Sequence, residues 1–240
     1  NNYLKVMSKV GIKYVEIGFR SFTSTTFRGS NWYTTDDYLE SLKIPSSIKI
    51  VVMVNASQIL NQKSILKATK LLFKPKSKSR IDMVRIACHF YEVKQSLKIL
   101  KELKRLGYKV AINLMQISEQ SDKKILEISK KLAQTNLDIL YFADSLGSMK
   151  INDIDKIIKG IKTFWKGNIG VHMHNNLGQA LQNNNYCMEQ GIQWIDSTIL
   201  GMGRGAGNAA TEQFIIEYKN FFKKKLDIIS LQNLISQEFA

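Results

Sequence analysis

The sequence predicts an α/β fold in which helices cover a parallel β-sheet. Two observations support this prediction: β-branched runs recur about every 25 to 35 residues, and amphipathic segments with helical spacing lie between them. The runs are apolar along nearly their whole length, as expected for strands that are buried on both faces of a parallel sheet.

Seven segments have the composition of such strands. Between the third and fourth, segment 93–107 places Leu97, Leu100 and Leu103 at helical spacing, and Gly107 supplies a helix stop. A further helical segment, 1–11, precedes the first strand. The seven predicted strands are 13–19, 48–54, 83–89, 109–115, 138–144, 168–174 and 193–199.

Seven strand–helix units after a helix that lacks its own strand predict a TIM (β/α)8 barrel whose first strand lies before Asn1. The glycine-rich turn that follows the first strand of an open, nucleotide-binding sheet is absent. We therefore expect residues 1–240 to form a single TIM-barrel catalytic domain, incomplete at the N-terminus. The C-terminus could be incomplete as well.

The net charge of +15 comes mostly from lysines that are scattered over the polar faces of predicted helices. Only segment 74–80 forms a compact basic cluster, so we expect no nucleic-acid partner. No apolar run is long enough for a membrane span, and no signal peptide is visible. Cys88 and Cys187 lie far apart, which suits a reducing cytoplasm and argues against a thiolate zinc site.

The segment "GVHMHNNLGQA" places two histidines one residue apart at the end of a predicted strand. Because side chains alternate along a strand, His172 and His174 point to the same face, with Cβ atoms roughly 6 to 7 Å apart. Two neutral imidazoles at this separation can bind one divalent metal ion. The alternative is a pair of unrelated core or loop histidines.

The segment "LGMGRGAGNAATE" follows the last predicted strand and contains four glycines within seven residues. Glycines allow the backbone to approach a ligand closely, and Asn208 is a candidate N-cap of the next helix. Two interpretations stay open at this point: a cradle for a phosphate or carboxylate, or a flexible loop before a helix.

Polar residues also collect at or near the ends of most predicted strands, where a barrel builds its active site. Each of them could instead be an ordinary cap or loop residue. They are Glu16, Arg20, His89, Asn113, Gln116, Asp144, Ser145, His172, His174, Asn175 and Asp196.

Four motifs in this order resemble one family: "EIGFRS", "FADSLGSM", "GVHMHNNLG" and "DSTILGMGRGAGNAATE". They are similar to the metal-dependent barrels related to hydroxymethylglutaryl-CoA lyase and isopropylmalate synthase, the DRE-TIM metallolyases. Within that family, the resemblance is greatest to the branch of 4-hydroxy-2-oxovalerate aldolase. It extends over residues 12–214, nearly the whole chain.

The resemblance implies roles for a few residues. His172 and His174 match the family's two metal-binding histidines, and Asn208 matches an asparagine that supports or completes the coordination. A divalent cation is implied, with Mn²⁺ or Mg²⁺ favoured over Zn²⁺ or Co²⁺. Three residues match substrate-binding positions of the family: Ser145 at the 2-oxo acid, Glu16 as a positioning acid and Arg204 in the loop that closes on substrate.

One departure matters. The family's "R-D-G" strand, with a catalytic arginine and a metal-binding aspartate, would lie before Asn1, so no catalytic residue is assigned within the chain. The resemblance implies reversible cleavage of a 4-hydroxy-2-oxo acid to pyruvate and an aldehyde, through a metal-stabilised enolate. Its small-molecule partners would be a 2-oxo acid and an aldehyde, and a homo-oligomer is compatible with the sequence.

Two alternatives to an aldolase remain. One is a Claisen-type acyltransferase that condenses acetyl-CoA with a 2-oxo acid, although the loop "GMGRGAGN" favours the aldolase branch. The other is a noncatalytic barrel. Metal content would separate both enzymes from the noncatalytic barrel, and dependence on acyl-CoA would separate the two enzymes from each other.

Overall fold

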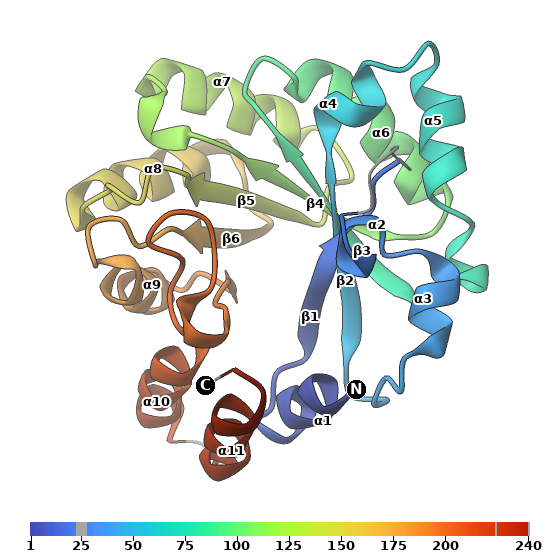
Figure 1. Ribbon diagram of the computed structural model, residues 1–240. Coiled ribbons are helices and arrows are strands. Elements are labelled where there is room, and N and C mark those ends of the chain that lie inside the picture. The colour runs from blue at the N-terminus through green and yellow to red at the C-terminus, as the bar shows by residue number, and fades with distance from the viewer. Residues whose placement is uncertain (23–27, 224, 240) are drawn as a thin grey trace. The chain divides into compact units, whose positions relative to one another are not determined.

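The structure is a computed structural model that describes residues 1–22, 28–223 and 225–239 (Figure 1). It contains two compact units, Asn1–Asn113 and Leu114–Ala240. Among the described residues, seven strands follow one another in the sheet in sequence order, β1 to β7. An open, doubly wound sheet reverses its strand order, whereas a (β/α) barrel keeps it. The predicted α/β barrel topology with seven strands is therefore confirmed.

In the first unit, β1 pairs with β2 and β2 with β3, all parallel. β3 is almost entirely buried, as its apolar sequence predicts. The elements of this unit are α1 (Asn2–Lys9), β1 (Tyr14–Phe19), α2 (Ser30–Tyr33), α3 (Asp36–Ser41), β2 (Lys49–Asn55), α4 (Ala56–Leu60), α5 (Ile65–Leu72), η1 (Lys76–Lys78), β3 (Ile81–Cys88) and α6 (Val93–Arg105), followed by β4 (Lys109–Leu114) at the boundary.

Helix α6 shows why the predicted helices form. It buries Ile99, Leu100 and Leu103 on one face, while its lysines lie on the other. The helix ends at Arg105, and Gly107 adopts a φ of +92°, which the absence of a Cβ makes inexpensive. The predicted stop is therefore confirmed.

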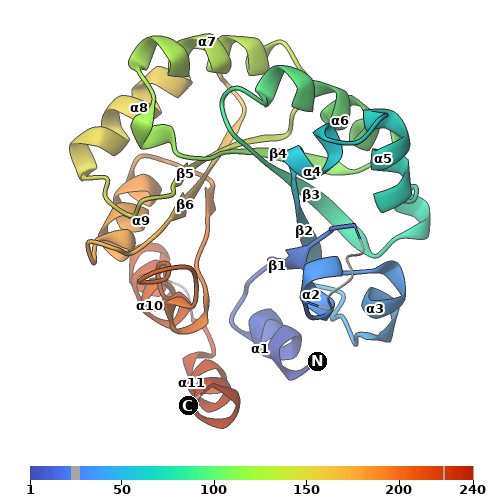
Figure 2. The ribbon, with the colours of Figure 1, turned by 45° about the horizontal axis from the view of Figure 1, so that its top comes forward.

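In the second unit, β5 pairs with β6 and β6 with β7, again in parallel. Figure 2 shows helices α7 to α9 beside these strands. The elements of this unit are η2 (Ile117–Glu119), α7 (Asp122–Ala133), β5 (Ile139–Asp144), α8 (Ile151–Phe164), β6 (Asn168–Met173), α9 (Ala180–Glu189), β7 (Trp194–Ile195), η3 (Ile199–Gly201), α10 (Thr211–Phe222) and α11 (Ile228–Glu238).

The seventh strand differs most from its prediction, since β7 comprises only Trp194 and Ile195 instead of 193–199. Residues beyond it pair with the returning glycine-rich loop. The N–H of Thr198 donates to the carbonyl of Ala209 at 3.0 Å, and Thr198 forms a parallel bridge with Ala210. This pairing satisfies backbone groups that a longer β7 would have directed at β6.

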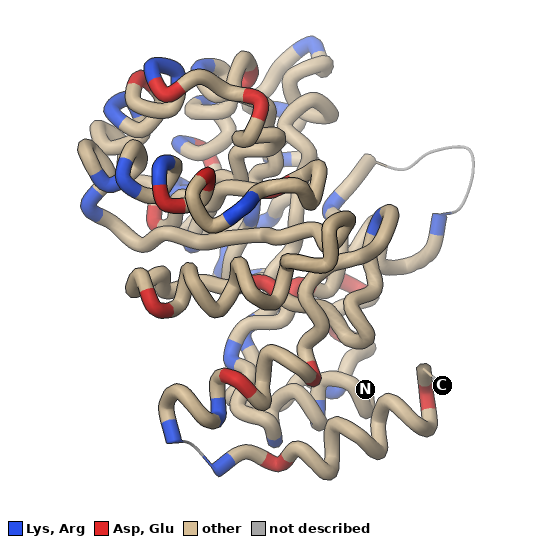
Figure 3. Tube along the Cα trace, turned by 90° about the vertical axis from the view of Figure 1, so that its left-hand side faces the viewer, with Lys and Arg blue, Asp and Glu red and all other residues tan. Residues whose placement is uncertain are grey.

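The basic residues are distributed along the helices and loops of both units (Figure 3). Several of them form exposed ion pairs with acids on the same helix, such as Lys124 with Glu127 and Lys159 with Asp155. In the part of the chain that the structure describes, no helix is long and apolar enough to span a bilayer.

Candidate metal centre

The two histidines of the H-x-H motif face each other at the carboxyl end of β6. His172 is the fifth residue of the strand and His174 follows its last residue. Their ring centroids lie 5.0 Å apart and their planes meet at 87°. Met173, between them, is buried on the other face, as strand alternation requires. The two rings are therefore close enough to bind one ion.

Asp196, directly after β7, orients the first of these rings. Its Oδ2 lies 3.0 Å from Nδ1 of His172. The backbone of Asp196 is itself held: its N–H donates to the Val171 carbonyl, and its carbonyl accepts from Nδ2 of Asn184 at 2.9 Å. A carboxylate at Nδ1 keeps the proton there and directs the Nε2 lone pair outward, the usual arrangement of a metal-binding histidine.

The second ring lies in a more buried, electropositive environment. Burial lowers the pKa of His174, and the nearby His172 and Arg204 lower it further. Backbone hydrogen bonds with Gly207 and Arg204 act in the opposite direction. The lowered pKa favours the neutral imidazole, which is the form that binds a metal ion.

Asn208 lies next to His174, with which it forms an antiparallel bridge. Its Nδ2 donates to the carbonyl of Met202 at 3.0 Å, whereas its buried Oδ1 has no hydrogen-bond partner among the described residues. Gly203 makes room for this side chain, because a Cβ there would lie 2.4 Å from Nδ2. A buried amide oxygen without a donor is a suitable ligand for a hard cation.

The expectation that Asn208 caps the next helix is wrong. Helix α10 begins at Thr211, and its N-cap residue is Ala210, which offers no side-chain hydrogen bond. The amide of Asn208 instead bonds the glycine-rich loop that precedes it. Pairing with His174 places Asn208 beside the histidines and not at the helix terminus.

The candidate ligand atoms of this region are thus two imidazole nitrogens and one amide oxygen. Imidazole nitrogens suit Zn²⁺ or Co²⁺, an amide oxygen suits Mg²⁺ or Mn²⁺, and positions are left for oxygen ligands. No cluster of three or more histidine, cysteine or acidic side chains suited to a metal occurs in the ranges 1–22, 28–223 and 225–239. The candidate ligands among the described residues are therefore His172, His174 and Asn208.

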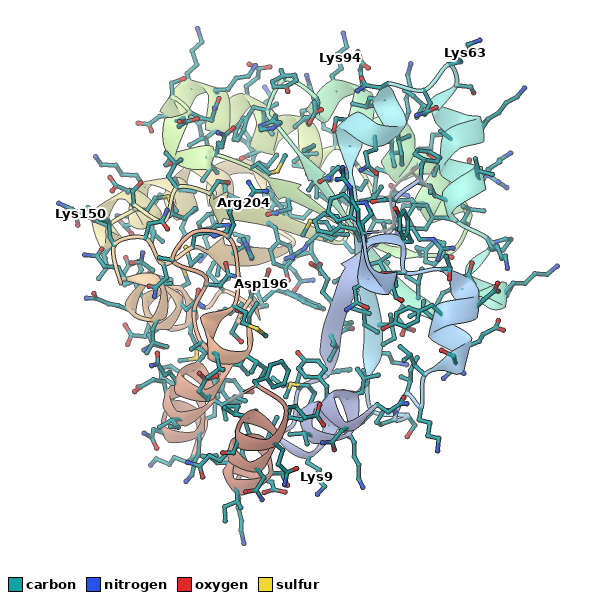
Figure 4. The ribbon with its side chains drawn as sticks, in the orientation of Figure 1. Lys9, Lys63, Lys94, Lys150, Asp196 and Arg204 are labelled. Carbon is teal, nitrogen blue, oxygen red and sulfur yellow. The ribbon has the colours of Figure 1, made fainter. Side chains whose placement is uncertain are left out.

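Two of the predicted substrate-binding residues lie in the same unit. Ser145 follows β5, and its Oγ accepts a hydrogen bond from the N–H of Gln116 at 3.0 Å. A hydroxyl that accepts one bond can still donate its own proton to a carboxylate. Arg204 is exposed in the glycine-rich loop and close enough to His174 to affect its pKa. Figure 4 labels Arg204 together with Asp196.

The third predicted substrate-binding residue, Glu16, lies in the first unit. It is in the middle of β1 and not at its end, which corrects the predicted position. Its Oε2 and Oε1 lie 2.8 and 2.9 Å from Nε and Nη2 of Arg85, a two-pronged ion pair. A strand bulge between Glu16 and Gly18 accompanies the shifted register.

Arg20 and Asp144, both predicted from their positions at strand ends, have structural roles. The guanidinium of Arg20 donates to the carbonyls of Leu72 and Thr34 and pairs with Asp36 at 2.6 Å. The carboxylate of Asp144 accepts from two backbone N–H groups in the turn after β5. Both are the ordinary loop and cap residues that the sequence left as an alternative.

The cysteines lie apart from this chemistry. Both are free and buried, and burial raises the pKa of Cys88 and of Cys187 to about 12. Both raised pKa values favour the neutral thiol at neutral pH.

The strand order defines an α/β barrel protein, and two facing histidines lie at the carboxyl end of one of its strands. The chain belongs to the HMGL-like family, whose model matches residues 1–235. It is 34% identical over 159 residues to 4-hydroxy-2-oxovalerate aldolase of Carboxydothermus hydrogenoformans, covering 66% of this chain and 47% of that protein. The corresponding protein of Geobacillus thermodenitrificans is 29% identical over 68% of this chain and 48% of its own length.

Solved structures agree. The N-terminal domain of a Bacteroides vulgatus protein described as an aldolase superposes with a TM-score of 0.89 at 27% identity, covering 98% of this chain and 77% of that one. The HMG-CoA lyase of Bacillus subtilis shares the fold, with a TM-score of 0.74 at 14% identity over 95% of this chain and 81% of that one. The chain spans about half the length of the curated relatives it matches.

Sequence reasoning placed Asp196 at a strand end but gave it no role. Its contact with His172 joins residues 24 positions apart in the chain. The available signal was an acid within the last predicted strand, 193–199, which follows the strand that bears both histidines. In a parallel sheet, such neighbouring strand ends meet at one edge.

Proposed function

We propose that residues 1–240 form one TIM-barrel catalytic domain of a divalent-metal-dependent aldolase, a carbon–carbon lyase. Its reaction would be reversible cleavage of a 4-hydroxy-2-oxo acid to pyruvate and an aldehyde. The family match over residues 1–235 and the names of the curated relatives support this activity. The observation on which it chiefly rests is the pair of facing imidazoles beside the unpartnered Oδ1 of Asn208.

In this proposal, His172, His174 and Asn208 hold the metal ion, and Asp196 keeps Nε2 of His172 available to it. Mn²⁺ or Mg²⁺ is the favoured ion, with Zn²⁺ or Co²⁺ as alternatives. When bound, the ion supplies Lewis-acid stabilisation of the negative charge that develops on the 2-oxo oxygen as the C–C bond breaks.

The chain's own residues bind and orient the acid end of the substrate. The Ser145 hydroxyl, oriented by the Gln116 N–H, would donate a hydrogen bond to the substrate carboxylate. The Arg204 guanidinium adds a positive charge on the glycine-rich loop beside His174. The positioning role of Glu16 stays a prediction from the family resemblance, and its carboxylate is paired with Arg85 within the first unit.

The test uses the full-length protein, stripped with a chelator and reloaded with Mn²⁺, Mg²⁺, Zn²⁺ or Co²⁺ in turn. Pyruvate release from 4-hydroxy-2-oxopentanoate is measured for each metal. We expect release that requires a metal and does not require acetyl-CoA. Release of free CoA from acetyl-CoA and a 2-oxo acid, without aldol cleavage, would identify a Claisen-type enzyme. No turnover in either assay would favour a noncatalytic barrel.

Four further statements remain predictions: a small-molecule partner, no nucleic-acid binding, a cytoplasmic location and assembly into a homo-oligomer. The scattered lysines support the second of these, because a nucleic-acid surface needs its charges on one face. Binding to duplex DNA at about 150 mM salt is the direct measurement, and we expect no sequence-specific complex.

A further inference from the structure

Three loops of the second unit meet at one side chain. They are the segments 145–150 after β5, 175–179 after β6 and 200–207 after β7. The middle loop supplies Asn176, whose Nδ2 donates to the carbonyl of Leu146 at 2.8 Å. Its Oδ1 accepts from the N–H of Ala206 at 3.2 Å. A single amide therefore joins the first loop to the third.

The two bonded peptides are neighbours of the proposed substrate contacts. Leu146 directly follows Ser145, and Ala206 lies two residues after Arg204. The separation of these two contacts is thus set in part by the length of one amide group. Neither hydrogen bond of Asn176 involves His172, His174 or Asn208.

Two glycines allow the flanking loops to approach Asn176 closely, although its side chain is exposed. A Cβ at Gly147 would lie 2.6 Å from the backbone nitrogen of Asn176, and a Cβ at Gly205 would lie 3.0 Å from its Oδ1. Both glycines have positive φ, 59° and 64°. The backbone of Leu177 also bonds Gly147, at 3.1 Å. The loops approach Asn176 so closely that only glycine fits at these positions.

We propose that Asn176 is a positioning residue that sets the spacing between Ser145 and Arg204 for the carboxylate of the substrate. This inference rests on the proposed function. The role requires one N–H donor and one carbonyl acceptor at a fixed separation, which the amide of asparagine supplies. Leucine has nearly the same shape but makes neither bond. Serine is too short to reach both loops.

The experiment compares Asn176→Leu and Asn176→Ser with wild type in the full-length protein. Three quantities are measured: hydrogen exchange of the Ala206 segment in the metal-free protein, Mn²⁺ affinity by calorimetry, and pyruvate affinity of the Mn²⁺-loaded protein. Asn168→Leu is the matched control, because its exposed amide lies at the opposite end of β6.

In both Asn176 variants we expect faster hydrogen exchange at Ala206, unchanged Mn²⁺ affinity and a roughly tenfold weaker pyruvate affinity. Pyruvate affinity should fall because a binding contact that is misplaced by about 1 Å loses most of its binding energy. The KM for the 4-hydroxy-2-oxo acid should rise more than kcat falls. Asn168→Leu should match wild type in every measurement.

Unchanged pyruvate affinity despite faster exchange would overturn the inference, and so would a parallel loss of Mn²⁺ affinity. Should Asn176→Leu fail to fold, Asn176→Ser decides by the same criteria. The proposed function fails separately, if wild type binds pyruvate with Mn²⁺ but cleaves no substrate. A wild type that binds no pyruvate would end both ideas, although the exchange data would still report whether Asn176 orders the loop.

Discussion

The polar side chains on and after the strands differ between the two units. In the first unit, the charged groups neutralise one another: Arg20 pairs with Asp36, and Arg85 pairs with Glu16. In the second unit, the rings of His172 and His174 lie 5.0 Å apart, and Asn208 pairs with His174 through its backbone. The buried Oδ1 of Asn208 has no hydrogen-bond partner among the described residues. Polar side chains of the barrel strands and their loops thus serve stability in one unit and form a candidate metal centre in the other.

This difference identifies which polar residues are available for function. A buried charge that already has its hydrogen bonds is costly to disturb and has little capacity left for a ligand. A buried acceptor without a donor is already desolvated in the folded protein, so a cation that binds it restores a lost interaction. Position at the end of a barrel strand is therefore insufficient evidence of a role, and the bonds that a side chain already makes must be counted.

The largest effect should come from breaking the ion pair of the first unit. Arg20→Met leaves Asp36 buried without its main partner, which should cost about 3–5 kcal/mol of unfolding free energy. Urea denaturation measures this loss of unfolding free energy. Lys124→Met, at an exposed ion pair, is the control, and its loss should be below about 1 kcal/mol. A stability loss below that of the control would show that the pair is not structural.

The next effect tests the second unit. His172→Ala or His174→Ala in the full-length protein should lower Mn²⁺ affinity by more than about 100-fold and abolish activity with it, since each removes a proposed ligand. His89→Ala is the matched control, because this third histidine also follows a strand but stacks on Tyr91 in the first unit. Wild-type metal content in both β6 variants would refute the proposed centre.

A smaller effect should follow from the carboxylate behind the site. Asp196→Ala removes the partner of Nδ1 of His172, so Mn²⁺ affinity should fall about 10- to 100-fold. Asp155→Ala, an acid on the surface of α8, serves as control. Calorimetric titration measures the Mn²⁺ affinity of the two variants. Equal affinities would show that Asp196 does not orient His172.

The smallest effect concerns substrate binding alone. Ser145→Ala should raise KM for the 4-hydroxy-2-oxo acid by roughly three- to tenfold with little change in kcat, because one hydrogen bond to the carboxylate is lost. The neighbouring, exposed Ser148→Ala should behave as wild type. Steady-state kinetics of both variants give the answer, and an unchanged KM would remove Ser145 from the substrate site.

The sequence alone determined the secondary structure and the fold class. All seven predicted strands are present, because apolar runs and β-branched composition are properties of short segments. The pairing of His172 with His174 was equally predictable from the sequence. Two strand residues that are separated by one residue share a face, whatever surrounds them. The shortened β7 could not be foreseen, because its outer residues pair with a loop that begins beyond it.

Only the tertiary structure decided which polar groups are already paired. Glu16 meets Arg85 across 69 residues, and Asp196 meets His172 across 24. No local pattern encodes such contacts, because they arise when strand ends that are distant in sequence converge at one edge of the sheet. The free Oδ1 of Asn208 and the two-loop contact of Asn176 likewise depend on how loops return to that edge. Periodicity specifies the elements, whereas long-range packing assigns each polar side chain its partner.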